Sequence, residues 1–167
     1  CDNMNDEKGQ LSGEYMLLVG SLIVVLMISI FMIANENELN IAMAAAKSGA
    51  DEGVASSSSA IYPKETFNEY DDMEGLKHPY SVSIVNVSYN SSGIDENYGK
   101  QKIQFKVYAK ASADYNKKEL DSIGDRINYN LRKSVATSFN TTDSTNKLYN
   151  PVFSSNYVFT TANVVWV

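Results

Sequence analysis

The feature that most constrains this chain is an uninterrupted apolar stretch near its N-terminus. Residues 15–35, YMLLVGSLIVVLMISIFMIAN, are 21 positions without a charged side chain. About 20 such residues span the hydrocarbon core of a bilayer as a helix. A helix of this length in a water-soluble core would need a polar face, and this stretch has none. We therefore expect it to enter a membrane at some stage.

The composition of the chain excludes several classes of function. The 167 residues carry a formal net charge of −6, whereas a nucleic-acid-binding surface needs clustered Lys and Arg. One Cys and one His leave no room for a disulfide framework or a zinc site of clustered Cys and His. The sequence shows no Ser-His-Asp or Cys-His arrangement and no glycine-rich phosphate loop. We therefore expect no enzyme, no cofactor, no bound metal and no nucleic-acid partner.

A short motif stands directly before the apolar stretch. Gly9 is followed by Gln10, Ser12, Glu14 and Tyr15, so that the glutamate is the fifth residue counted from Gln10. This order and spacing, followed by a long apolar helix, resembles the class III signal peptide of archaeal type IV pilin-like proteins. Their pattern is Gly, then Gln-x-Ser-x-Glu, often with Tyr next. The resemblance covers about 25 residues.

The resemblance implies a specific life cycle. A prepilin peptidase in the membrane would cut between Gly9 and Gln10 and remove the leader, residues 1–9. The cleaved helices would then leave the membrane and pack, with identical or related pilin subunits, as the core of an extracellular filament on the archaeal cell surface. The expected function is that of a structural subunit of a type IV pilus-like filament for surface adhesion.

Glu14 is the residue on which the expected assembly chemistry depends, with Ser12 and Tyr15 beside it. An unpaired carboxylate among packed apolar helices would cost several kcal/mol. The α-amino group that cleavage frees on Gln10, in the same or an adjacent subunit, could pair with Glu14 and set the register of an incoming subunit. Alternatively, Glu14 simply stays at the hydrated membrane edge.

Helical character is expected to continue past the apolar stretch, over residues 10–59. Small residues recur there every four positions, in two series: Ala42, Ala46, Ala50 with Val54, and Ala45, Gly49 with Gly53. Such spacing lets helices approach closely, on neighbouring subunits, on the protein's own head domain, or on both through different faces. A lone membrane anchor needs no face of small residues, so the presence of this face favours a filament subunit. The alternative is a membrane-anchored surface binding protein or a pseudopilin-like secretion component.

An acidic connector is expected at residues 60–79, because five carboxylates lie there and Pro63 stops the helix. Carboxylates in a loop can bind calcium, but their order fits no calcium loop of known spacing. We therefore interpret the segment as a solvated connector and His78 as an ordinary loop residue.

Residues 80–167 predict a small α+β head domain, with one helix packed on an antiparallel sheet. Strands are expected at 80–89, with a bulge between Ile84 and Val85, and at 102–111, which alternates apolar and polar side chains as a sheet with one wet face does. Residues 90–99 are the expected loop between them. A helix is expected over 117–139, because Asn116 and Glu119 have the spacing of a capping box and an apolar stripe recurs at spacings of three and four: Leu120, Ile123, Ile127, Leu131, Val135 and Phe139. Two more strands are expected, at 148–153 on an edge because of Pro151, and at 157–167 in a central position.

Three Asn-x-Ser/Thr triplets begin at Asn86, Asn90 and Asn140. All three fall in the expected outer domain, where N-glycosylation is possible because the modification is bulky and lies on the surface. Such triplets also arise by chance in a chain rich in Asn and Ser.

Overall fold

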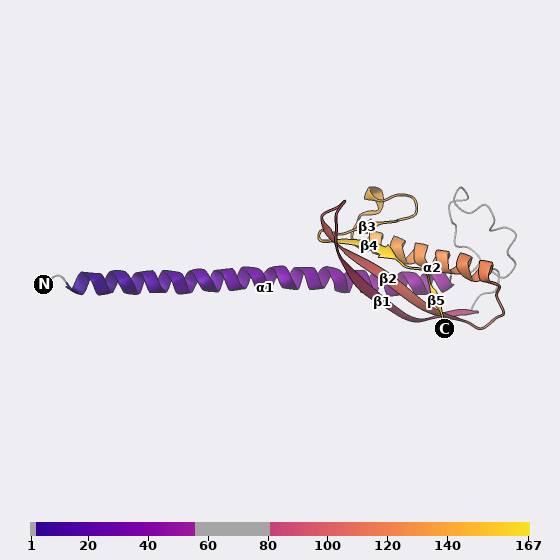
Figure 1. Cartoon of the computed structure of the whole chain (residues 1–167), viewed down its shortest axis with the longest axis horizontal. Helices are drawn as coiled ribbons and strands as arrows, with labels where there is room; N and C mark the ends of the chain where they lie inside the picture. The colour runs from indigo at the N-terminus through magenta and orange to yellow at the C-terminus, as the bar shows by residue number, and fades with distance from the viewer. Residues whose placement is uncertain (1–2, 56–80) are drawn as a thin grey trace. The chain divides into compact units, whose positions relative to one another are not determined.

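The computed structural model describes residues 3–55 and 81–167, with side chains from Ser12 onward. Within these ranges the chain forms a long helix, a second helix and a small mixed sheet of five strands (Figure 1). The expected α+β layout, with a long apolar N-terminal helix ahead of a small sheet and one packed helix, is therefore confirmed. The expected acidic connector and His78 lie outside the described residues.

Helix α1 runs over Asn3–Ala55. It begins before the expected start at residue 10 and includes most of the expected leader. The chain separates into two compact units, Cys1–Leu39 and Asn40–Val167, and the boundary between them falls within α1. The described part of the first unit is helix alone, and that of the second combines residues 40–55 of α1 with 81–167.

The sheet is mixed rather than purely antiparallel. Strand β1 (Val82–Asp95) pairs antiparallel with β2 (Lys100–Ala111), but β4 (Tyr157–Thr161) and β5 (Val165–Trp166) both pair parallel with β2. The reason is the helix between them: a crossover through α2 (Lys117–Ser138) returns the chain in the direction of β2. The short β3 (Val152–Phe153) pairs antiparallel with β4 at the far edge of the sheet, as Pro151 predicted.

Helix α2 covers one face of this sheet. The middle of its predicted apolar stripe is buried, with Ile123, Ile127, Leu131 and Val135 at 1% exposure or less, and the two ends, Leu120 and Phe139, are half-buried. At its C-terminus, the Phe139 ring stacks on Phe159 of β4 at 5.7 Å between centroids, and Phe159 stacks in turn on Phe105 of β2 at 5.6 Å. The core thus lies between α2 and the face of the sheet formed by Ile103, Phe105, Val107, Ala109 and Phe159.

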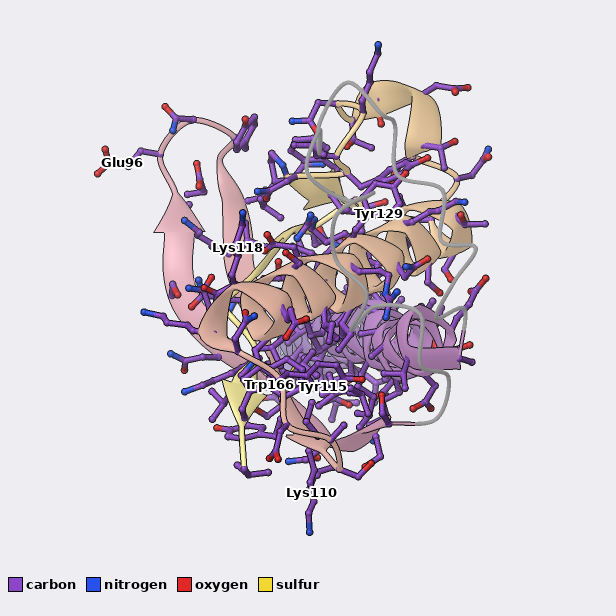
Figure 2. All side chains as sticks on the ribbon, turned by 90° about the vertical axis from the view of Figure 1, so that its right-hand side faces the viewer. Glu96, Lys110, Tyr115, Lys118, Tyr129 and Trp166 are labelled. Atoms are coloured by element: carbon purple, nitrogen blue, oxygen red, sulfur yellow. The ribbon has the colours of Figure 1, made fainter. Side chains whose placement is uncertain are left out.

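The opposite face of β2 is wet, as its alternation predicted. Residues 102, 104, 106, 108 and 110 are partly or fully exposed, and Lys106 places its ammonium 5.5 Å from the centre of the Tyr108 ring. Figure 2 shows Lys110 projecting from one end of the β1–β2 hairpin and Glu96 from its turn at the other.

The bounds of the strands differ in part from the sequence prediction. The predicted slip near Val85 is present as a register shift between Ile84 and Asn86. However, β1 continues to Asp95 through a second irregularity at Gly93, whose φ is +83°, so most of the expected 90–99 loop is strand. The hairpin closes tightly instead, with the Gly99 amide donating to the Asp95 carbonyl at 2.8 Å.

The strand expected at 148–153 is reduced to Val152–Phe153 by a side-chain turn. The Asn146 side-chain oxygen accepts from the amides of Leu148 and Asn150 at 3.0 Å each, and these contacts hold residues 146–150 out of the sheet.

The strand expected at 157–167 is interrupted. Phe105 is opposite Thr161 and Tyr108 is opposite Val165, so β2 advances three residues while the C-terminal segment advances four. The extra residue interrupts the strand over Ala162–Val164. The backbone amide of Ala162 still donates to the Phe105 carbonyl at 2.8 Å, and the Asn128 side chain donates to the Ala162 carbonyl at 2.9 Å. The first part of this expected strand, β4, nevertheless has the central position that was predicted, because it lies between β2 and β3.

Candidate functional site

The apolar segment 15–35 is exposed around the whole circumference of α1. Leu17 is 76% exposed, Leu26 54% and Ile33 66%, and no other element of the described chain covers them. Among the described residues, this segment belongs to the one helix that is long and apolar enough to cross a membrane. An 18-residue stretch of that helix has a mean hydropathy of 2.9, and none of the stretch is buried. A surface of this kind needs lipid or other apolar helices around it.

The two serines inside the apolar segment are compatible with such surroundings. The Ser21 hydroxyl donates to the Leu18 carbonyl at 2.8 Å, and the Ser29 hydroxyl donates to the Val25 carbonyl at 2.9 Å. Where water is absent, each unsatisfied polar group costs several kcal/mol. These local bonds remove that cost and leave the surface of the segment apolar.

The residues of the expected processing and assembly motif all lie on the same helix. Gly9 and Gln10 are helical and lie before Ser12, the first residue whose side chain is described. Ser12, Glu14 and Tyr15 are exposed, and Tyr15 is 69% accessible. Glu14 is thus an exposed carboxylate directly beside the apolar segment.

The small residues beyond the apolar segment face the protein itself. Both predicted series are buried or half-buried, and Ala42, Ala46 and Ala50 are fully buried. A Cβ built on Gly49 would lie 2.6 Å from the Asn130 carbonyl oxygen and 2.8 Å from the Leu131 Cα, so helix α2 lies directly against this face (Figure 1). Of the two expected roles, the structure gives these residues the intramolecular one. The face consequently no longer distinguishes a filament subunit from an anchored protein.

The three candidate glycosylation sites are accessible. Asn86 and Asn90 lie on β1, opposite Tyr108 and Gln104 on the wet face of the sheet, and both are exposed. Asn140 is exposed just after α2, with a φ of +53°. Exposure is required for a bulky modification, and all three asparagines meet that requirement.

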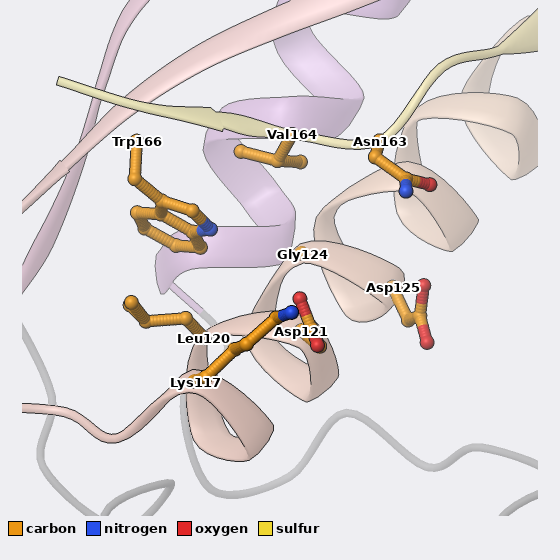
Figure 3. A pocket seen from close by; sticks show the side chains of 8 residues that line it. All are labelled: Lys117, Leu120, Asp121, Gly124, Asp125, Asn163, Val164 and Trp166. Carbon is orange, nitrogen blue, oxygen red and sulfur yellow. The ribbon is translucent and has the colours of Figure 1, made fainter.

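One feature of the second unit was not found by the sequence analysis. A cavity of about 340 Å³ opens between the N-terminal half of α2 and residues 163–166 (Figure 3). Burial raises the pKa of the Asp125 carboxyl at its margin above the usual value, with Arg132 acting in the opposite direction and Asp121 adding to the rise. The lining side chains come from Lys117, Leu120, Asp121, Gly124, Asp125, Asn163, Val164 and Trp166.

Only the side of the cavity formed by α2 has a pattern in the sequence. Lys117, Asp121 and Asp125 recur every four residues on α2 and thus share one face of it. Nothing in the local pattern links that face to residues 163–166, which reach it through the parallel pairing of β5 with β2.

The described residues contain no group of three or more His, Cys, Asp or Glu side chains that could hold a metal ion. No family model, curated protein or solved structure matches this chain.

Proposed function

We propose that this protein is a structural subunit of an archaeal type IV pilus-like extracellular filament that serves surface adhesion. The observation that carries the proposal is the motif Gly9-Gln10-x-Ser12-x-Glu14-Tyr15 directly before an apolar helical segment that is exposed on every side. In the precursor, lipid would cover that segment; in the filament, equivalent helices would cover it. The head domain would then form the outer surface.

The proposed path of the chain includes a membrane stage and an external stage. The precursor is held in the cell membrane by the apolar segment, and a prepilin peptidase cuts between Gly9 and Gln10. Identical or related subunits then assemble through their apolar segments outside the cell. N-glycans on Asn86, Asn90 and Asn140 would lie on the exposed outer surface of such a filament.

A second candidate is a membrane-anchored surface binding protein or a pseudopilin-like secretion component. The observation in its favour is the internal use of the small-residue face, because Gly49 and Gly53 contact α2 of the same chain. The apolar segment would then remain in the bilayer permanently. The two candidates differ in whether the processed chain is recovered in sheared filaments or in the membrane fraction.

The charge of Glu14 provides the test. Glu14→Gln keeps the shape of the side chain and removes its charge, so cleavage after Gly9 should continue while the number of filaments falls at least tenfold. The reason is that an unpaired partner amine, or a lost pairing, costs several kcal/mol in a site without water. Glu36→Gln, just past the other end of the apolar segment and also exposed, is the matched control and should leave filament number unchanged.

The measurement is electron microscopy of sheared filaments together with N-terminal sequencing of their subunits. Subunits that begin at Gln10, and filaments lost only with Glu14→Gln, support the proposal. Processed chain found only in membranes, with no filament containing it, favours the anchored protein instead.

A further inference from the structure

The cavity beside α2 has a lining that suits one kind of ligand. In Figure 3 the Trp166 ring and Leu120 stand toward one end, Asp125 and Asn163 toward the other, and Lys117 with Asp121 between them. Ligand pockets generally combine an apolar wall with a few polar groups that fix orientation, in volumes of about 300–1,000 Å³. At about 340 Å³ this cavity is at the small end, with room for a single small ring.

Two close contacts shape the cavity. A Cβ on Gly124 would lie 3.3 Å from the Val164 Cβ and 3.9 Å from a carbon of the Trp166 ring. The absence of a side chain at Gly124 therefore lets residues 163–166 lie close to α2 at this point. The indole is held at the margin of the cavity and remains partly exposed.

The polar groups narrow the chemistry of the ligand. Lys117 offers only donors, the two carboxylates offer only acceptors, and the Asn163 amide offers both. An anionic ligand would meet Asp121 and Asp125, and a cationic ligand would meet Lys117. A neutral ligand whose groups each donate and accept, as hydroxyl groups do, satisfies all four side chains.

The apolar wall completes the match. An indole presents a flat apolar surface of large area, against which the C–H face of a sugar ring can pack. The Asp125 side chain is exposed at the margin of the cavity, where its carboxylate can accept a hydrogen bond from a ring hydroxyl. We propose that the cavity formed by Lys117, Asp121, Asp125, Asn163 and Trp166 is a binding site for a neutral pyranose sugar.

This site lies wholly within the second unit, so it does not depend on whether the chain polymerises. If the proposed filament is correct, sugar binding would supply the chemistry of its adhesion. A failure of filament assembly would leave the site untouched, and a failure of sugar binding would leave the assembly argument untouched.

The chain provides its own probe, because Trp166 is its single tryptophan. The full chain is kept in lauryldimethylamine oxide, a detergent without a sugar headgroup, and titrated with methyl glycosides of glucose, galactose and mannose under selective tryptophan excitation. We expect a saturable change in emission with at least one glycoside, with a midpoint in the millimolar range, as suits a ligand of about a dozen non-hydrogen atoms.

Variants locate the effect. Asp121→Asn removes a charged acceptor from an exposed position of α2, and we expect it to weaken binding by about tenfold or more. Asn163→Ala should also weaken binding, and it serves as the second variant. Asp143→Asn, an exposed carboxylate in the short helix η3 (Thr142–Ser144), is the matched control and should bind within twofold of the original chain.

The outcomes divide clearly. Saturable binding that Asp121→Asn and Asn163→Ala weaken, while Asp143→Asn does not, supports the site. No saturable change with any glycoside, equal affinity in the Asp121→Asn variant, or a response to choline or inorganic phosphate but not to glycosides would each overturn it.

Discussion

Gly49 shows how a single missing side chain determines the packing of the second unit. A Cβ at this position would lie under 3 Å from backbone atoms of Asn130 and Leu131 and from the Ser134 side chain. Glycine in a helix normally costs about 1 kcal/mol relative to alanine. Here that cost is accepted because only glycine allows α1 and α2 to approach so closely.

We therefore predict that Gly49→Ala lowers stability, although alanine is the better helix former. Backbone atoms cannot move aside as a flexible side chain would, so overpacking of about 1–3 kcal/mol should outweigh the gain in helix propensity. Thermal unfolding of the full chain in detergent, followed by Trp166 emission, measures the effect.

Ser48→Ala is the control for this prediction, because Ser48 is exposed on the neighbouring position of the same helix. It should leave the unfolding midpoint unchanged or raise it slightly. A Gly49→Ala variant that unfolds at a higher temperature than the original chain would show that the two helices do not pack at this distance.

At the scale of the element, α2 begins at a complete capping box. The Asn116 side-chain oxygen accepts a hydrogen bond from the backbone N–H of Glu119, and the backbone N–H of Asn116 donates to the Glu119 carboxylate, each at 2.9 Å. These bonds satisfy two backbone donors that a helix start otherwise leaves open. They also fix where α2 begins, and with it the position of Lys117 and Asp121 at the cavity.

Asn116→Ala should therefore destabilise the second unit by about 1 kcal/mol, which corresponds to a drop in the unfolding midpoint of roughly 3–5 °C for a unit of this size. The double variant with Glu119→Ala should cost less than the sum of the two single variants, because the two residues share one pair of bonds. Asn97→Ala, in the exposed hairpin turn, is the control. Fully additive losses at Asn116 and Glu119 would contradict the reciprocal pairing.

The same element shows what could and could not be predicted from sequence. The stripe from Leu120 to Phe139 and the Asn116–Glu119 spacing are local signals, and both predicted α2 correctly within one residue. The alternation of 102–111 predicted which face of β2 is buried. In each case the physical cause lies within a few residues of its effect.

Long-range pairing was not predictable in this way. The parallel contacts of β4 and β5 with β2 join residues 40 or more positions apart. The break after β4 and the start of β3 depend on the side chains of Asn128 and Asn146. The two candidate sites also differ in whether local sequence could predict them. The Gln10–Tyr15 motif is contiguous in sequence, whereas the cavity joins α2 to residues 163–166 only after the sheet has formed.

At the scale of the whole molecule, the chain separates into Cys1–Leu39 and Asn40–Val167. The buried apolar residues of the described chain, from Ala42 to Phe159, all belong to the second unit. The apolar segment of the first unit contributes nothing to that core. Its exposed surface is of the kind that lipid or other apolar helices cover.

The second unit should therefore fold without the first. We predict that a fragment of residues 40–167 is a water-soluble monomer with one cooperative thermal transition, because it retains every residue of the described core. A fragment of residues 81–167 should be neither monomeric nor cooperatively folded. Without Gly49 and Gly53, the surface of α2 around Ile127 and Leu131 would be open to water. Sedimentation velocity and circular dichroism of the two fragments measure the difference. Aggregation of the 40–167 fragment, or equal stability of both fragments, would show that residues 40–55 of α1 do not belong to the folding unit of the head.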